Sequence, residues 1–384
     1  MAVNHYDVIV LGVGGVGSAA LYHAAKRGVR ALGIEQFSLA HDRGSSHGHT
    51  RLIRQAYFEH PDYVPLVQRA FGLWNELEQE AGERLYHETG LLQVGPPSGE
   101  VIRGVRESAV QHKLDIENLS LAEANARFSG FVIPEDCEAI FERRAGYLLV
   151  ERAVVAYARQ AQRRGAQVVV DQTVRRWQVD CDSVLVETDR EKYRTSRLII
   201  AAGPWSGQLL GTLGISLEVR RKPLCWWPTQ DDRYRTDRGC PAFLYDLPQG
   251  CFYGFPQIDS RGLKAAEHTG GDIVDNPLTV DRQLHTADRD RVASFIGQFL
   301  PAVAPKSSEF TVCMYTMTPD AHFIVDRHPE HPQVAFAAGL SGHGFKFACV
   351  LGEALCDLAL MGQTSLPIGF LSASRPALKG ARPT

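Results

Sequence analysis

The chain has 384 residues, of which 44% are hydrophobic and 22% are charged, and its formal net charge is −3. This length and composition are typical of a soluble globular protein with two sizeable domains. The small net charge argues against nucleic acid or a membrane surface as the main partner, and favours a small or zwitterionic ligand. No apolar run approaches the ~20 residues of a membrane span, and the first residues lack the layout of a signal peptide. We therefore expect a cytoplasmic protein.

The eight cysteines are scattered along the chain without a CxxC pair. This spacing argues against a disulfide framework and against a structural zinc site, so we expect no metal. Most of the cysteines should be reduced and structural. Cys349 and Cys356 are seven positions apart in a helical pattern, which predicts that they share one buried face.

The first thirty-five residues have the pattern of a βαβ nucleotide-binding unit. An apolar, β-branched run at residues 6–11 (YDVIVL) leads into GVGGVG at 12–17, a helical stretch and a second apolar run. In such a unit the glycines allow a tight turn, a close approach to a pyrophosphate and close helix packing, while an acidic residue binds a ribose hydroxyl. The residues predicted to bind a dinucleotide in this way are Gly12, Gly14, Gly17 and Glu35.

The periodicity then changes several times, which indicates that two domains alternate along the chain. Helical spacing is clear at 66–77, before Gly82, and returns at 151–165 and around Val292. A capping box at 120–123 begins another helix. Strand, glycine loop and helix recur together from residue 334. We predict an α/β (mixed α+β) fold, in which a Rossmann-like nucleotide-binding domain of residues 1–88, 148–218 and 319–384 is interrupted by a mixed-sheet substrate domain of residues 89–147 and 219–318.

Polar or charged residues stand beside glycine or proline in three stretches, namely 46–54 (SHGHTRLIR), 313–320 (CMYTMTPD) and 342–347 (GHGFKF). Arg51 and Arg54 are three apart, so on a helix they would share a face and direct two positive charges into a cleft. A solvated start to a helix is the alternative. Lys346 lies just inside a helix that begins at a glycine loop, where an ammonium opposes the helix dipole and a bound ligand would help to explain it.

The run GLKAAEH at 262–268 is ambiguous on its own. If it is a strand, Lys264 and His268 lie on one face. Without other evidence, a surface lysine and an ordinary histidine are the commoner outcome.

Taken together, GVGGVG, CMYTMTPD and the closing GLSGHGFKF at 339–347 resemble the flavin-dependent amine oxidase family that contains monomeric sarcosine oxidase, N-methyltryptophan oxidase and peroxisomal pipecolate oxidase. The resemblance covers nearly the whole chain. It implies that FAD is bound by the nucleotide domain and that a mixed-sheet domain binds the substrate.

The resemblance also implies roles for individual residues. Cys313 occupies the position of a cysteine that is joined to the flavin as a thioether, so FAD would be covalent. Lys264 matches the lysine at which relatives activate dioxygen, where a buried cation would stabilise developing negative charge. His47 and Arg51 match residues on the opposite flavin face, where a positive field favours the anionic reduced ring.

Other positions match substrate and cofactor contacts of the family. Arg54 and Lys346 match the pair that binds the substrate carboxylate. The positions around the rest of the substrate are Leu244, Tyr253, His268 and Tyr315. Further cofactor contacts are implied at Thr50, Val174, Gly342 and Gly344.

The implied reaction is oxidation of the carbon–nitrogen bond of a secondary, N-methyl or cyclic, α-amino acid by a monomeric enzyme. The products would be an imine, which hydrolyses, and hydrogen peroxide from dioxygen. Nearby cations would lower the pKa of the substrate amine, so no strong side-chain base is required. Substrate identity stays open, because His49 stands where sarcosine oxidases have aspartate, Leu244 stands near their methionine, and the GLKAAEH run differs from theirs.

Three alternatives remain. A pyridine-nucleotide dehydrogenase would satisfy the opening motif, but it leaves Cys313 and the closing glycine loop unexplained. A non-catalytic FAD-binding subunit fits less well because Lys264 and Arg54 are present. A flavin dehydrogenase that passes electrons to a carrier is the third.

Overall fold

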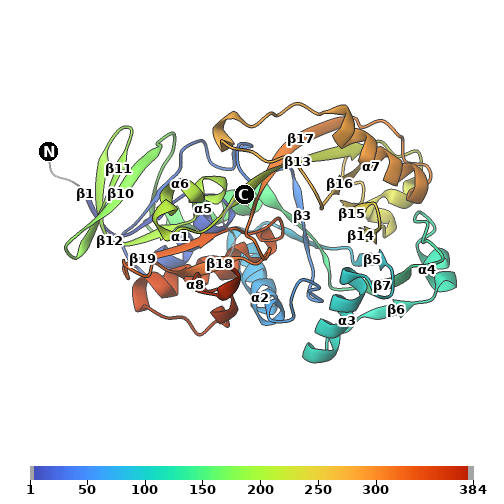
Figure 1. Ribbon diagram of the computed structural model, residues 1–384, viewed down its shortest axis with the longest axis horizontal. Coiled ribbons are helices and arrows are strands. Elements are labelled where there is room, and N and C mark those ends of the chain that lie inside the picture. Colours follow the sequence, from blue (N-terminus) through green and yellow to red (C-terminus); the bar gives the residue numbers. More distant parts are fainter. Residues whose placement is uncertain (1–3, 379–384) are drawn as a thin grey trace.

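The computed structural model describes residues 4–378. Within those residues the strands form an eight-stranded first sheet, an eight-stranded second sheet and a three-stranded third sheet. Figure 1 shows the first sheet at one end of the molecule and the second at the other, with β3 (Thr50–Ile53) between them. The predicted mixed α/β class is confirmed.

The first sheet has a parallel centre built from the opening motif. β1 (Asn4–Leu11) lies between β12 (Lys192–Ile200) and β2 (Ala31–Ile34) and is parallel to both. Val8 packs in one apolar cluster and Ile9 in another, so the strand is buried on both faces and reads as a continuous apolar run. The other strands of this sheet are β9 (Gln167–Val169), β10 (Val174–Asp180), β11 (Ser183–Thr188), β18 (Ile324–Arg327) and β19 (Val334–Ala338).

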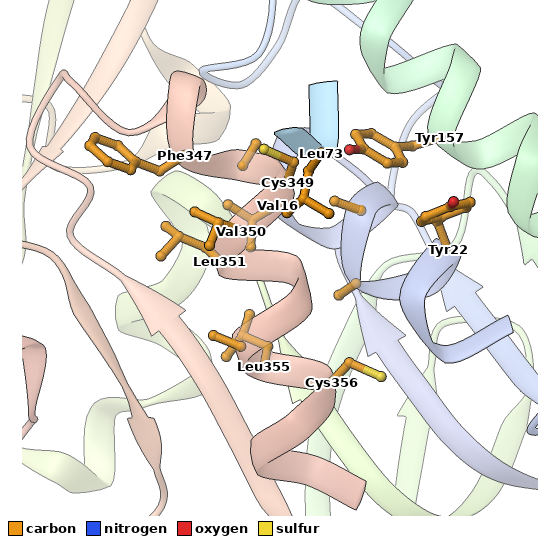
Figure 2. Packing of buried hydrophobic residues seen from close by; sticks show 14 of the residues in the cluster. Val16, Tyr22, Leu73, Tyr157, Phe347, Cys349, Val350, Leu351, Leu355 and Cys356 are labelled. Carbon is orange, nitrogen blue, oxygen red and sulfur yellow. The ribbon is translucent and has the colours of Figure 1, made fainter. Parts of the chain in front are cut away.

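Four helices pack together beside this sheet, namely α1 (Gly15–Lys26), α2 (Tyr63–Ala81), α5 (Val150–Arg163) and α8 (Ala348–Met361). Their apolar side chains form the core in Figure 2, where Val16, Leu73 and Tyr157 meet the side chains of α8. A Cβ at Gly352 would lie 2.6 Å from the backbone nitrogen of Ala20, so glycine permits the close contact of α8 with α1. The predicted burial of the two cysteines of α8 is confirmed.

The second sheet forms the other end of the molecule. Its strand order is β17, β13, β16, β15, β14, β5, β7, β6. Phe295 of α7 (Thr286–Phe299) stacks on Phe252 at 4.6 Å and covers one face. The strand bounds are β5 (Leu91–Gly95), β6 (Glu117–Leu119), β7 (Glu138–Glu142), β13 (Glu218–Trp227), β14 (Ala242–Leu247), β15 (Gly250–Phe255), β16 (Leu263–Glu267) and β17 (Glu309–Met317).

Smaller elements complete the fold. α3 (Glu100–His112) packs on β5, and α4 (Leu121–Arg127) begins with the predicted capping box. In the third sheet, β8 (Gly146–Leu149) pairs with β3 and with β4 (Tyr86–Glu88). The further helices and turns are α6 (Ser206–Leu209) and the short 3₁₀ segments, of which η6 (Phe345–Phe347) precedes α8.

The sheets follow the alternation of segments along the chain. All strands of the first sheet come from 1–88, 148–218 and 319–384, and those of the second come from 89–147 and 219–318, apart from Glu218. Both ends of the chain run beyond the described residues, and the division into two domains stays a prediction. None of the helices in the described part is long and apolar enough to cross a membrane.

Candidate functional site

A continuous cavity runs from the β1–α1 loop to the second sheet. Ligands of α/β proteins bind at the carboxyl ends of parallel strands, and this cavity begins at such an edge. The predicted site residues that line it are Gly12, Gly14, Glu35, Arg51, Arg54, Val174, Leu244, Tyr253, His268, Cys313, Tyr315, Gly342, Gly344 and Lys346. Four others lie outside this lining, namely Gly17, His47, Thr50 and Lys264.

The glycine loop has the geometry that a nucleotide requires. Gly12 has φ +83°, a conformation that favours glycine, and a Cβ at Gly17 would lie 1.8 Å from the carbonyl oxygen of Gly12. The carboxylate of Glu35 accepts hydrogen bonds from the backbone of Val13 at 2.9 Å and of Phe37 at 3.1 Å. Glu35 therefore stabilises the loop in addition to facing the cavity.

Polar atoms in the cavity wall fit a ligand with hydrogen-bonding groups along its length. Within residues 4–378, Nε1 of Trp205 and Oγ1 of Thr316 are buried without a hydrogen-bond partner, and both residues line the cavity. Buried polar groups are nearly always paired in folded proteins. Together with the glycine loop, these atoms fit a dinucleotide such as FAD.

The two arginines do not share a helix face, so that prediction was wrong. Residues 50–53 form β3, which pairs with β8 almost a hundred positions later, and Arg51 and Arg54 line the cavity from a strand and its end instead of from a helix. Arg51 donates hydrogen bonds to the carbonyl oxygen of Ser45 and to Sγ of Cys313, each at 3.1 Å. Arg54, just past the strand, binds Glu59 at 2.8 and 2.6 Å.

Arg54 and Lys346 both lie against the ring of Tyr57. The guanidinium carbon of Arg54 lies 4.1 Å from the ring centroid, and Nζ of Lys346 lies 5.2 Å from it. Lys346 donates to the carbonyl oxygen of His343 at 2.8 Å. Burial and the nearby Arg54 lower the pKa of Lys346 to about 7. The pair thus offers one permanent charge and one that titrates near neutral pH.

Glu59 neutralises Arg54 in this structure. Burial opposes ionisation of Glu59, yet Arg54, His343 and Lys346 together lower its pKa to about 2. The carboxylate stays charged at neutral pH. A ligand carboxylate would compete with it for the same guanidinium.

Three predicted residues gather on the second sheet, namely Tyr253 on β15, His268 after β16 and Tyr315 on β17. Nδ1 of His268 lies 3.4 Å from the hydroxyl of Tyr315. Burial, followed by nearby Lys222, lowers the pKa of His268 to about 4, and burial raises the pKa of both phenols. All three side chains are neutral at pH 7 and can exchange hydrogen bonds with a neutral amine.

Lys264 lies beyond the cavity lining, near Arg51. The strand interpretation is confirmed for Lys264 by β16, which covers Leu263–Glu267, whereas His268 lies just past its end. Nζ of Lys264 donates to the carbonyl oxygens of Gly48 and Thr50 at 2.5 and 2.9 Å. Burial and then Arg51 hold its pKa well below the usual range.

His47 does not contribute the positive charge that its predicted role suggests. Burial, and then nearby Arg51, lower the pKa of His47 to about 4, so the imidazole is neutral at pH 7. Arg51 supplies a permanent positive charge at this wall.

Sequence reasoning missed Tyr57, Glu59, Glu151 and Lys222. Lys222 is 3% exposed, and its Nζ lies 5.4 Å from the ring centroid of Tyr315, while burial lowers its pKa to about 8. It stands among the basic residues of EVRRKP at 218–223, which are typical of a solvated strand. Only strand pairing, which sets Lys222 opposite Cys313, signals its position.

Comparisons with known proteins agree with this geometry. The model of the FAD dependent oxidoreductase family matches residues 7–358. Monomeric sarcosine oxidase of Bacillus sp. (strain B-0618) is 39% identical, with 98% of this chain and 97% of the relative covered. N-methyl-L-tryptophan oxidase of Yersinia pestis (strain Pestoides F) is 35% identical, with 96% and 99% covered.

A solved structure extends the likeness to three dimensions. NikD, described as an unusual amino acid oxidase essential for nikkomycin biosynthesis, superposes with a TM-score of 0.85 at 26% identity, covering 96% of this chain and 97% of that one. The resemblance drawn from the glycine motifs and the CMYTMTPD stretch is confirmed. The chain belongs to the FAD-dependent oxidoreductase family, in the group that includes monomeric sarcosine oxidase and N-methyl-L-tryptophan oxidase.

Proposed function

We propose that this flavoenzyme oxidises secondary α-amino acids, above all N-methyl or cyclic ones, and uses dioxygen as the electron acceptor. The observation that carries the proposal is one cavity lined by a cation pair, Arg54 and Lys346, and by the neutral cluster of Tyr253, His268 and Tyr315. Such a wall suits a ligand that carries a carboxylate and an amine. The named relatives are oxidases of sarcosine and of N-methyl-L-tryptophan.

FAD would occupy the length of the cavity. Gly12, Gly14 and the amino terminus of α1 would hold its pyrophosphate, and Glu35 would bind the adenosine ribose. The roles of Thr50, Val174, Gly342 and Gly344 as cofactor contacts remain part of this proposal. When bound, FAD would take a hydride equivalent from the substrate and pass electrons to dioxygen.

Cys313 is the proposed point of covalent attachment. Its side chain is buried at the cavity wall, and the guanidinium of Arg51 lies 3.1 Å from its sulfur. Cys313 therefore lies where a ligand in the cavity can meet its sulfur.

The protein would bind the substrate through its carboxylate and through its amine. Arg54 and Lys346 would take the carboxylate, and the amine would lie against His268 and the two phenols. Because these cations lower the pKa of a nearby amine, the substrate would bind with a neutral nitrogen, and His268 would accept its N–H. Water would then hydrolyse the imine product. Lys264 would place an ammonium near the flavin, where dioxygen acquires negative charge.

Peroxide production by the purified protein tests this function. We expect oxygen uptake and hydrogen peroxide with at least one of sarcosine, N-methyltryptophan, pipecolate and proline. A flavin that these compounds reduce, and that transfers electrons to a dye but not to dioxygen, would identify a dehydrogenase. No reduction by any of them would favour a non-catalytic FAD-binding subunit. We further propose a cytoplasmic monomer, which sedimentation and cell fractionation would check.

A further inference from the structure

The ammonium of Lys264 binds to the 48–50 loop, which consists of Gly48, His49 and Thr50. The carbonyl oxygens of Gly48 and Thr50 accept its hydrogen bonds at 2.5 and 2.9 Å, and Oγ1 of Thr50 accepts another at 3.1 Å. Gly48 has φ 88° and His49 has φ 73°. Positive φ is costly for a histidine, so interactions elsewhere must hold this loop in place.

Glu151 holds the loop from its other side. Its Oε1 accepts hydrogen bonds from the backbone N–H groups of Gly48 at 2.6 Å and His49 at 3.1 Å, and Oε2 accepts from His49 at 3.2 Å. The backbone N–H of Val150 donates to the carbonyl oxygen of His49 at 2.9 Å. Glu151 lies in the first turn of α5, where the helix dipole favours a carboxylate. The loop that binds Lys264 through carbonyls thus binds Glu151 through amides.

The charges around Lys264 make this carboxylate important. Positive charges approach from Arg51 on β3 and from Arg261 in the turn before β16, and the titratable groups His49 and Cys313 lie near. The carboxylate of Asp259 forms an ion pair with Arg261 at 2.6 Å. The rings of Phe255 and Trp226 lie 4.8 and 5.6 Å from the ammonium. Glu151 is therefore a carboxylate that offsets the cations at this site.

We propose that Glu151 is a positioning residue for Lys264, holding the 48–50 loop around the ammonium and supplying a negative charge that favours it. The inference rests on the proposed function for its kinetic consequence, because Lys264 is there assigned to the reaction with dioxygen. Its structural part concerns only the coupling between the two side chains.

The expected direction follows from the pKa of Lys264. Burial and Arg51 lower this pKa, whereas Glu151 raises it. Removing the negative charge would lower it further, so the ammonium would be lost at a lower pH. Reoxidation that needs the ammonium would then decline at a lower pH, while reduction of the flavin by substrate would keep its pH dependence.

Glu151→Gln separates charge from geometry, because its amide oxygen still accepts from the backbone of Gly48 and His49. Glu123→Gln is the matched control, since Glu123 also lies in a first helical turn and accepts from a backbone N–H, that of Ser120. We expect the alkaline limb of the reoxidation rate to move down by about one pH unit in Glu151→Gln and to stay in place in the control. An unmoved limb in Glu151→Gln would overturn the role of its charge.

A double-mutant cycle tests the coupling without any turnover. Thermal unfolding is measured for wild type, Glu151→Gln, Lys264→Met and the double variant. We expect the loss of Tm caused by Glu151→Gln to be smaller when Lys264 is already methionine. Additive losses would overturn the coupling. If the cycle shows coupling but no amine is oxidised, the proposed function fails and the positioning role of Glu151 stands. If amines are oxidised and the losses are additive, the proposed function stands and the positioning role fails.

Discussion

The guanidinium of Arg51 donates a hydrogen bond to Sγ of Cys313 at 3.1 Å, between residues 262 positions apart. One lies on β3 and the other on β17, so the third sheet brings a cation to a cysteine of the second. Among the eight cysteines, all of which lie in the described residues, Cys313 alone lines the cavity, and this gives a physical reason why it would react with a cofactor.

Cys313→Ser tests the attachment. We expect the variant to release its flavin to the supernatant after acid precipitation, because a serine hydroxyl does not form the thioether. Cys181→Ser, at an exposed cysteine, is the control and should keep the flavin on the polypeptide. Flavin that is fully released from the wild type would contradict covalent attachment.

Lys264→Met should slow reoxidation of the flavin far more than its reduction, since the variant loses the ammonium but no group that binds substrate. Stopped-flow measurement of the two half-reactions checks this. Lys346→Met provides the comparison, because we expect it to weaken substrate binding and to leave the rate of reoxidation almost unchanged. Equal losses in both half-reactions of Lys264→Met would show that the lysine is misassigned.

Lys346 should make substrate binding depend on pH near neutrality. Its pKa is about 7 in the free protein, so the carboxylate meets an ammonium below that pH and a neutral amine above it. Loss of a charge-assisted hydrogen bond predicts a KM about ten- to hundredfold higher in Lys346→Met at pH 6. The ratio of the KM of Lys346→Met to the KM of the wild type should fall toward one at pH 9. A ratio that is constant with pH would argue against this role.

Glu59→Gln should bind carboxylate ligands more tightly, because the wild-type carboxylate competes with them for Arg54. Inhibition by acetate or another simple carboxylate measures this. A weaker inhibition in Glu59→Gln would mean that Glu59 supports the binding site rather than blocks it.

The same variant should lose stability in a pH-dependent way. The pKa of Glu59 is about 2 when folded, below its usual value of 4.5, so its ionised form stabilises the folded state. This contribution is fully present above about pH 4.5 and is lost as the pH falls toward 2. The Tm difference between wild type and Glu59→Gln should therefore shrink over that range. A difference that grows on acidification would contradict the ion pair with Arg54.

Two glycine variants distinguish folding from cofactor binding. A Cβ at Gly14 would meet only Oγ of Ser46 at 3.5 Å, an ordinary contact, but it would stand in the cavity wall. We expect Gly14→Ala to fold and to be purified with little flavin. Gly17→Ala should lower the Tm, because its Cβ would lie 1.8 Å from the carbonyl oxygen of Gly12. Full flavin content in Gly14→Ala would argue against a pyrophosphate at this loop.

Local patterns explain how much of the fold could be predicted from the sequence. The strand, glycine loop and helix at the start of the chain need only the order of nearby residues, as do β19 and α8 near its end. The capping box of α4 was equally local. These features follow from apolar periodicity and from the special backbone of glycine.

Contacts between distant segments explain what was missed. The helix predicted for Arg51 and Arg54 failed because β8, which turns residues 50–53 into a strand, comes much later in the chain. Glu151 reaches Gly48 across 103 positions. The neutral state of His47 depends on burial that no spacing reveals.

Anaerobic mixing with a secondary amino acid, followed by oxygen, tests the central claim most directly. The wild-type protein is titrated with sarcosine, N-methyltryptophan, pipecolate or proline under argon, and the flavin absorbance is followed. The account predicts bleaching by at least one of them and full recovery of the colour on admission of oxygen, with one hydrogen peroxide formed per flavin. A yellow protein that none of the four compounds bleaches would contradict it.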